Sequence, residues 1–288
     1  MYKVLFNPHS GNGKGKENIK KLTSAVGNAE LFDMTEVNSY KEFFAGLGEE
    51  DDIIIAGGDG TLNRFINDTA DIDIPCRIFY YAMGSGNDFA RDIGLAEYGA
   101  PVDITEYLKD LPSVTVKGKT YKFLNNMGYG IDGYCCEVGD SLREKGTQDI
   151  NYAGIAIKGL LFHYKPANAV ITVDGEEYRF RKVWLAPTMK GRFYGGGMMP
   201  TPAQDRNDPE GKVSVLVMHG AGKLHTLIVF PSIFKGEHIK HEKMCTVLTG
   251  HEIKVEYDRP VAAQVDGETV LGVTEYSVSA KAKSKVNA

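Results

Sequence analysis

The run Gly-Gly-Asp-Gly-Thr at residues 57–61 combines residue types that can hold a phosphate group. Three β-branched residues at 53–55 precede it and indicate a short strand that is buried on both faces. The glycines permit a tight turn and a close approach of backbone to a ligand. The helix that we expect from Thr61 directs its free N–H groups at that turn. Asp59 lies in the turn, and a carboxylate beside phosphates suggests a divalent cation between them. An ordinary strand–turn–helix corner is the alternative interpretation.

Two more glycine-rich turns follow predicted strands. Asn-Pro-His-Ser-Gly-Asn-Gly at residues 7–13 comes after a strand at 3–6, and Met-Gly-Ser-Gly-Asn-Asp-Phe-Ala-Arg at 83–91 comes after a strand at 78–82. The first turn lacks the Walker A spacing, and Lys16 stands where a Rossmann fingerprint needs its third glycine. Ligands bind at the carboxyl ends of parallel strands, so we expect the three turns to converge on one crevice. A dinucleotide site of the Rossmann kind is disfavoured there.

The elements that position these turns alternate between strand and helix over residues 1–111. This alternation is typical of a doubly wound α/β domain built on a parallel sheet. The strands are expected at 3–6, 29–32, 53–56 and 78–82, and the helices at 16–26, at 40–47 and from Thr61 onward.

After Pro112 the pattern changes to short β-type runs, with Asp174-Gly175 as a hairpin signal. We therefore expect an antiparallel β-sandwich domain at 112–277, and residues 278–288 either end that domain or return to the first one. The β-type runs lie at 113–116, 121–125, 169–173, 178–185, 213–218, 244–248, 252–257, 261–265 and 276–280, and helical segments at 151–164 and about 223–234.

The net charge of −5 is unevenly divided along the chain. Residues 1–111 hold 10 Lys and Arg against 19 Asp and Glu, whereas residues 112–288 hold 23 against 19. An acidic first domain disfavours nucleic acid as a partner and suits a site that handles Mg²⁺. The mildly basic second domain favours contact with an anionic bilayer, and an incidental charge difference is the alternative.

The expected location is cytoplasmic, with peripheral contact at the inner membrane face. The four cysteines show no CxxC spacing, which suits buried thiols in a reducing compartment. The first residues are typical of a strand rather than a signal peptide, because the apolar run stops at Asn7-Pro8. No apolar run approaches the roughly 20 residues that a membrane span needs. A homodimer is an open alternative to a single chain.

These motifs together resemble the diacylglycerol kinase catalytic family, specifically its soluble bacterial lipid kinases. The resemblance rests on NPHSGNG at 7–13, GGDGTLN at 57–63, GSGNDFAR at 84–91, the GGGM run at 195–198 and Asp-Gly-Glu at 266–268, in the family's order. It implies a nucleotide-binding α/β domain, a C-terminal β-sandwich, and phosphorylation of a diacylglycerol-like lipid hydroxyl by ATP and Mg²⁺ in the cleft between them. Such an activity belongs to lipid metabolism and phospholipid biosynthesis.

The resemblance also implies roles for individual residues. Asp59, Asp88 and Asp103 resemble an acidic network around Mg²⁺ and water, although Asp88 alone could be a helix N-cap. Glu268 matches the family's proton acceptor, with Asp266 beside it. A plain hairpin turn at Asp-Gly-Glu is one alternative, and Asp59 is the rival candidate for the base. The ATP phosphate cradle comprises Asn7, Pro8, His9, Ser10, Gly11, Gly58, Asp59, Gly60, Thr61, Leu62 and Asn63, with Ser85 in place of the family's Thr and Thr35 as a further nucleotide contact.

Two positions depart from the family pattern. Arg64 follows the cradle where the family commonly has Glu, so one nucleotide-side contact of the family does not carry over directly to this sequence. The family's structural Mg²⁺ loop usually reads Asp-Gly, whereas residues 202–211 here read PAQDRNDPEG. Asp205 and Asp208 are the favoured metal ligands in that loop, Glu210 is a third candidate, and a solvated acidic loop without metal is the alternative.

Two rival functions remain open at this point. An NAD kinase is the first, because its family also uses a GGDG turn, although the turns at 7–13 and 84–91 and the Asp-Gly-Glu run favour the lipid kinase. The second is a catalytically weak, nucleotide-regulated lipid-binding protein. The apolar residues at 155 and 160–162 are expected in the core, and a lipid-facing surface is their alternative role.

Overall fold

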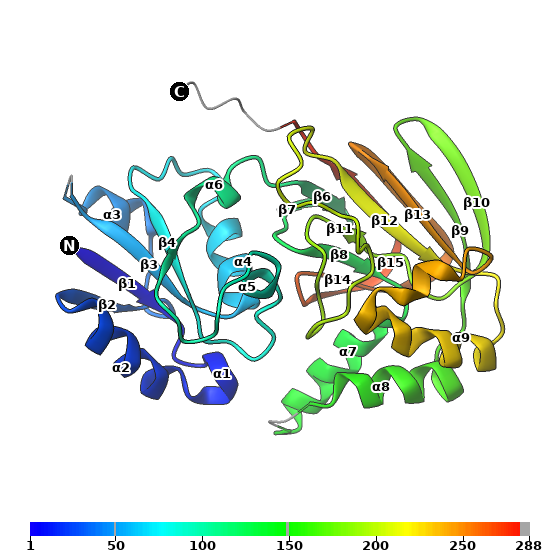
Figure 1. The fold of residues 1–288 in the computed structure, drawn as a ribbon, viewed down its shortest axis with the longest axis horizontal. Coiled ribbons are helices and arrows are strands. Elements are labelled where there is room, and N and C mark those ends of the chain that lie inside the picture. The colour runs from blue at the N-terminus through cyan, green and yellow to red at the C-terminus, as the bar shows by residue number, and fades with distance from the viewer. Residues whose placement is uncertain (49, 148–149, 283–288) are drawn as a thin grey trace. The chain divides into compact units, whose positions relative to one another are not determined.

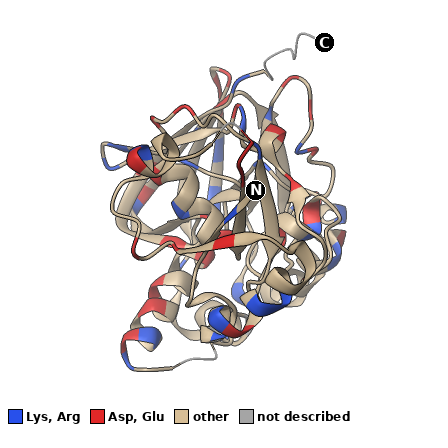
Figure 2. Ribbon diagram, turned by 90° about the vertical axis from the view of Figure 1, so that its left-hand side faces the viewer, with Lys and Arg blue, Asp and Glu red and all other residues tan. Residues whose placement is uncertain are grey.

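The computed structural model describes residues 1–48, 50–147 and 150–282, and the chain forms two compact units (Figure 1). The first unit is Met1–Lys109 and the second is Asp110–Ala288. The division falls close to the boundary expected after residue 111. Of the terminal segment 278–288, Ala280 N donates to His251 O within the second unit, and residues 283–288 lie outside the described residues. Charged residues of both signs are distributed over helices, strands and loops (Figure 2).

The first unit is the expected α/β domain on a five-stranded sheet of order β2-β1-β3-β4-β5. Strands β1 to β4 are parallel, and the two-residue edge strand β5 pairs antiparallel with β4, so the sheet is mixed rather than purely parallel. The strands are β1 (Tyr2–Phe6), β2 (Ala29–Asp33), β3 (Asp52–Gly57), β4 (Ile78–Ala82) and β5 (Val102–Asp103). The helices are α1 (Ser10–Gly13), α2 (Gly15–Val26), α3 (Tyr40–Ala45), α4 (Asp59–Asp68), α5 (Asp88–Asp92) and α6 (Thr105–Leu108).

Burial explains why the sheet forms from these residues. The three isoleucines of β3 are completely buried, as a strand covered on both faces requires. Leu22 of α2 packs in one cluster with Ile54 and Met83. Phe65 of α4 makes an edge-to-face contact with Tyr40 of α3, with ring centroids 5.6 Å apart.

The second unit is the expected antiparallel β domain, with ten strands joined in one hydrogen-bonded network. The two runs expected at 252–257 and 261–265 form one long strand, β14, whose pairing with β15 shifts register between Glu256 and Val261. The strands are β6 (Ser113–Val116), β7 (Lys119–Lys122), β8 (Asn126–Tyr129), β9 (Ala167–Val173), β10 (Glu176–Val183), β11 (Thr188–Met189), β12 (Val213–Met218), β13 (Cys245–Gly250), β14 (Glu252–Val265) and β15 (Glu268–Ser279).

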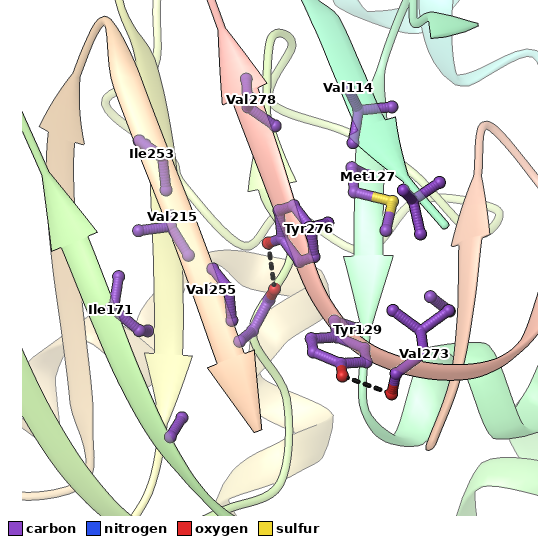
Figure 3. Close-up of a cluster of buried hydrophobic side chains, with 14 of the residues drawn as sticks. Val114, Met127, Tyr129, Ile171, Val215, Ile253, Val255, Val273, Tyr276 and Val278 are labelled. Atoms are coloured by element: carbon purple, nitrogen blue, oxygen red, sulfur yellow. Dashed lines mark hydrogen bonds between the residues drawn. The ribbon is translucent and has the colours of Figure 1, made fainter. Parts of the chain in front are cut away.

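Two tyrosines fasten the core of this unit to the strand backbones (Figure 3). Tyr129 Oη donates to Val273 O at 2.6 Å, and Tyr276 Oη donates to Ala186 O at 3.1 Å. The Tyr129 ring also stacks on Tyr257, with centroids 3.9 Å apart. These contacts fix the end of β8 against β14 and β15, the strands that carry the Asp-Gly-Glu run.

A 14-residue helix, α7 (Ile131–Glu144), follows β8 and was not expected from the sequence. Gly133 and Gly139 lower the helix propensity of this segment, and close packing is the reason that glycine occupies both positions. A Cβ on Gly133 would lie 2.1 Å from Ala262 O, so only glycine lets α7 approach β14 this closely. The other helical elements are α8 (Tyr152–Lys158), the π-helical turn η1 (Gly159–His163), α9 (Lys223–Val229), and the 3₁₀ helices η2 (Phe230–Lys235) and η3 (Glu237–Lys240). No helix among the described residues is long and apolar enough to cross a membrane.

Two Asp-Gly pairs of the second unit, at 174–175 and 266–267, form two-residue hairpin turns. Asp174 and Gly175 have φ of 48° and 89° and join β9 to β10, which confirms the expected hairpin. Asp266 and Gly267 have φ of 44° and 95° and join β14 to β15. Positive φ at both central residues is the geometry that favours Asp-Gly between twisted antiparallel strands.

Candidate active site

The second and third glycine-rich turns of the first unit touch through their backbones. A Cβ on Gly84 would lie 2.4 Å from Gly58 Cα, and a Cβ on Gly58 would lie 2.9 Å from Gly84 Cα. Only glycine can occupy either position, because any side chain there would overlap the opposite main chain. Because Gly58 and Gly84 have no side chains, the backbones of the two turns can lie in contact at one edge of the sheet.

The first turn joins the same cluster through α4. Asn7 Nδ2 donates to Thr61 Oγ1 at 3.3 Å, and the Ser10 and Thr61 hydroxyls lie 3.2 Å apart. Gly11 has φ of +60°, and a Cβ there would lie 2.9 Å from Met83 O in the third turn. The structure therefore brings the three turns together, as the parallel sheet predicts.

Asp59 connects the second turn to the third. Its Oδ2 accepts from Asp88 N and its Oδ1 from Phe89 N, both at 2.9 Å. Asp59 therefore binds the N–H groups that begin α5, and Asn87, not Asp88, is the cap residue of that helix. A Cβ on Gly86 would lie 3.5 Å from Asp59 Oδ2 and 3.7 Å from Asp88 Oδ2. Two carboxylates thus face the same glycine.

Asn87 holds the third turn closed and was not singled out from the sequence. Its Oδ1 accepts from Gly84 N at 3.0 Å, and its Nδ2 donates to Gly84 O at 2.9 Å and to Glu97 Oε1 at 3.0 Å. Asn87 has φ of 50°, a left-handed conformation that asparagine tolerates better than most residues. Asparagine between glycine and aspartate after a strand is the sequence signal that indicates such a clamp.

The other predicted cradle residues differ in what they can offer a ligand. Leu62 is completely buried and Asn63 is 5% exposed, so at these two positions the side chains belong mainly to the interior. Gly60, His9 and Ser85 are exposed, and Pro8 is buried beside Asn7 in the first turn. Thr35 follows β2, and its N–H and hydroxyl both donate to Asp33 Oδ1.

Asp103 has a local structural partner in the first unit. Its Oδ1 accepts from the N–H and the hydroxyl of Thr105 at 2.9 and 2.6 Å, at the start of α6. The Thr105 hydroxyl in turn accepts from Ile78 N at 2.9 Å. Asp103 thus fastens the edge strand to β4, and its expected place in an acidic network stays a prediction.

In the second unit, Asp266 and Glu268 lie two residues apart and have opposite environments. Asp266 Oδ1 accepts from Asn125 N and Asn126 N at 2.8 and 2.9 Å, and Oδ2 accepts from Leu124 N at 2.5 Å. Glu268 is exposed, and its carboxylate makes no hydrogen bond or ion pair within the described part of the chain. The Asp266 carboxylate therefore stabilises the hairpin, whereas the Glu268 carboxylate extends from it into solvent.

Beneath this hairpin lies a buried polar cluster that sequence reasoning did not find. Asp132 in the first turn of α7 is 6% exposed, and burial raises the pKa of its carboxyl to about 6. Gly128 has no room for a side chain because Asp132 Oδ2 and Gln264 Nε2 converge on it, at 1.9 and 2.3 Å from an added Cβ. Tyr194 also lies near Asp132, but neither Asp132 Oδ2 nor the Tyr194 hydroxyl makes an ordinary hydrogen bond to another described residue. Residues 130–132 follow β8 with a glycine two residues before the aspartate, as residues 57–59 do at the end of β3. This shared spacing was the available sequence signal for Asp132.

Arg206 holds the loop at 202–211 against residues 124–125, the connection between β7 and β8 that Asp266 also binds. Its guanidinium is buried and donates to Leu124 O at 2.5 Å and to Asn125 Oδ1 at 2.7 Å. Asp205 accepts from Asn207 N, and Asp208 accepts from Glu210 N and Lys212 N, so both aspartates shape the loop. Within residues 1–48, 50–147 and 150–282, no group of three His, Cys, Asp or Glu side chains is placed to hold a metal ion. Mg²⁺ binding by Asp205 and Asp208 stays a prediction.

Two family models divide the chain as the fold does. Residues 1–117 match the diacylglycerol kinase catalytic domain, and residues 125–282, more than half of the chain, match the YegS C-terminal NAD kinase beta sandwich-like domain. The chain belongs to the diacylglycerol kinase catalytic family with this C-terminal domain. The family membership predicted from the motifs is therefore confirmed.

Known proteins agree with this membership. A diacylglycerol kinase of Bacillus subtilis (strain 168) is 24% identical over 280 residues, covering 92% of this chain and 89% of the relative. One of Mycobacterium tuberculosis (strain CDC 1551 / Oshkosh) is 28% identical over 204 residues, covering 68% and 64%. A crystal structure of a diacylglycerol kinase from Bacillus anthracis str. Sterne has a TM-score of 0.63 at 20% identity, covering 98% of this chain and 94% of that one. At this identity the structural likeness shows the fold alone.

Proposed function

We propose that this chain is an ATP- and Mg²⁺-dependent kinase that phosphorylates the hydroxyl of a diacylglycerol-like lipid. The observation that carries the proposal is the meeting of three glycine-rich turns at residues 7–11, 58–63 and 84–88. Backbone N–H groups at a strand-to-helix turn are suited to phosphate oxygens. Relatives whose names read diacylglycerol kinase supply the acceptor class.

The carboxylates of the first unit fit a Mg²⁺ ion that is shared with substrate phosphates. Mg²⁺ is usually held by one or two carboxylates together with phosphates and water, not by a full cage of protein ligands. Asp59 and Asp88, which face the same glycine, are the residues that would hold it. When bound, the ion supplies neutralisation of the charge on the β- and γ-phosphates.

Glu268 is the base that the structure supports best. It accepts the proton of the lipid hydroxyl as the alcohol oxygen forms its bond to the γ-phosphorus, and the bond to the oxygen of the departing ADP breaks. A base needs an available lone pair, and the exposed Glu268 carboxylate has no hydrogen-bond partner within residues 1–48, 50–147 and 150–282. Both oxygens of Asp59 accept backbone N–H groups, which favours a binding and positioning role for that residue.

The nucleotide half of the proposal is tested by calorimetry with the purified chain. We expect ATP to bind only weakly without Mg²⁺ and more tightly with it, and Asp59→Asn to abolish the gain. Ser85→Ala, an exposed change in the same cluster, should weaken binding far less. Binding of NAD without any Mg²⁺-dependent binding of ATP would contradict the lipid-kinase assignment.

A further inference from the structure

Three large apolar side chains of the second unit are among the most exposed in the molecule. Phe162 is 72% exposed, Leu224 is 71% and Ile228 is 70%. Phe162 lies in a segment expected to be core, and that expectation is wrong for this residue, whereas its neighbour Leu160 is completely buried. Aromatic and aliphatic side chains exposed to this extent on neighbouring elements need an explanation other than folding.

The three side chains belong to two elements that pack together. Lys223 Nζ, at the start of α9, donates to Leu161 O in η1 at 3.1 Å. Leu224 and Ile228 are four residues apart on α9 and therefore lie on one face of that helix. Figure 1 shows α7, α8 and α9 gathered on one side of the β domain. The exposed residues thus form a localised apolar surface, not scattered single positions.

The same elements carry positive charge and no negative charge. Residues 150–173 and 211–236 contain no Asp or Glu, although a quarter of the whole chain is charged. Lys158 ends α8 and Lys223 begins α9, and both are exposed. We call Phe162, Leu224, Ile228, Lys158 and Lys223 together the basic apolar face.

The residues that follow Phe162 in the chain line a basic pocket. His163 and Lys165, within three residues of Phe162, line a cavity of about 350 Å³ together with Arg259, Tyr164 and one carboxylate, that of Glu137. The Arg259 guanidinium lies over the Tyr164 ring, 5.8 Å from its centroid. The Tyr164 hydroxyl is buried without a hydrogen-bond partner within the described residues. Its lining suits an anionic group such as a lipid phosphate.

We propose that the basic apolar face docks the protein on an anionic bilayer surface. Apolar side chains that enter the interface beside lysines attracted to anionic headgroups are the pattern of peripheral membrane binding. A second copy of the chain fits the face less well, since a two-fold contact would bring lysines against lysines. The inference rests on the proposed function in one respect, namely that a lipid substrate resides in such a bilayer.

The face is also close in the fold to the proposed base. Thr269, next to Glu268, donates to Asp140 Oδ2 of α7 at 2.6 Å. Helix α7 also packs against α8, where the Tyr152 ring lies beside Gly139. Helix α7 therefore contacts both α8 and the strand that carries Glu268.

Vesicle binding by the full chain tests the proposal. The probes are vesicles of phosphatidylcholine, alone or mixed in equal parts with phosphatidylglycerol, and binding is followed by sedimentation. We expect binding to the anionic vesicles that salt weakens. Leu224→Ser combined with Ile228→Ser should weaken it about ten- to hundredfold, and Lys158→Gln about fivefold. Leu31→Ser, an apolar residue of the first unit that is 42% exposed, is the matched control and should bind as the native chain does.

The readouts separate this inference from the proposed function. Melting temperature and turnover of a dispersed short-chain diacylglycerol should be unchanged in the Leu224/Ile228 variant. Native-like vesicle binding by that folded variant, or no vesicle binding by the native chain, would overturn the docking face. Loss of a dimer in the variant with vesicle binding intact would assign the face to self-association instead. Face-dependent vesicle binding by a chain that phosphorylates no lipid would refute the kinase and leave the docking face standing.

Discussion

Replacing Asp266 and Glu268 separately by their amides should produce two different failures. Asp266 accepts three backbone N–H groups from residues 124–126 through two oxygens. In Asp266→Asn one oxygen becomes an NH₂ group, which cannot accept from the N–H group that faces it. The change should leave the positive φ of 44° unstrained, because asparagine also tolerates that conformation.

The size of the effect follows from the number of bonds. One hydrogen bond to a charged acceptor is lost, at about 1.5–3 kcal/mol, and the remaining two become bonds to a neutral oxygen. We expect a loss of about 2–4 kcal/mol in the free energy of unfolding of the second unit. For a unit of this size that lowers the melting temperature by about 5–15 °C. Glu268→Gln breaks no hydrogen bond within the described residues and should melt as the native protein does.

Activity should follow the opposite pattern. Loss of a general base typically costs about 10²–10⁴-fold in rate, so Glu268→Gln should lower kcat by that order and leave the KM for ATP nearly unchanged. Asp266→Asn, assayed well below its melting temperature, should retain more turnover than Glu268→Gln. The reasoning is refuted if Asp266→Asn melts normally but is inactive, or if Glu268→Gln keeps its kcat.

Three further changes probe the rest of the candidate site. Asp59→Asn should remove nearly all turnover, because an amide cannot replace the charge that we propose organises Mg²⁺. Steady-state kinetics like those of the native chain, with a melting control, would show that Asp59 is only a turn residue. Gly84→Ala should destabilise the first unit by about 3 kcal/mol or more, since its Cβ would lie 2.4 Å from Gly58 Cα, whereas Gly60→Ala meets nothing within 4 Å and should be nearly neutral in a urea titration. Asp132 has a folded pKa of about 6 against 3.8 unfolded, so the native chain loses stability as pH rises from about 4 through 6. Asp132→Asn should therefore gain up to about 3 kcal/mol over the native chain between pH 4 and 8, and equal pH profiles would show that burial does not shift this carboxyl.

Local pattern was sufficient to predict strands β1 to β4 and helices α2, α3 and α4 of the first unit, but not its shorter helices α1, α5 and α6. Buried β-branched strands and glycine turns are encoded within a few residues, and β4 appears at the expected residues, Ile78–Ala82. The edge strand β5 was missed because two residues carry no periodicity. Helix α7 was missed because Gly133 opposes helix formation locally and is required only by its contact with Ala262.

The roles within the candidate site were harder to predict than its position. Asp266 and Glu268 both look like catalytic carboxylates in the sequence, and only the bonds to residues 124–126, 140 positions away, distinguish the anchor from the exposed group. The raised pKa of Asp132 likewise depends on burial against Gln264, which no local pattern encodes. Long-range contacts of this kind decide which polar residue is structural.

Transfer of labelled γ-phosphate from ATP tests the central claim most directly. The purified chain is incubated with labelled ATP, Mg²⁺ and vesicles that contain diacylglycerol, with NAD as the acceptor in a parallel reaction, and the products are separated by extraction. The account predicts label in the lipid phase that requires Mg²⁺ and is lost in Glu268→Gln. Label in NAD and none in lipid would make the protein an NAD kinase, and label in neither acceptor, with vesicle and ATP binding intact, would reduce it to a lipid-binding protein.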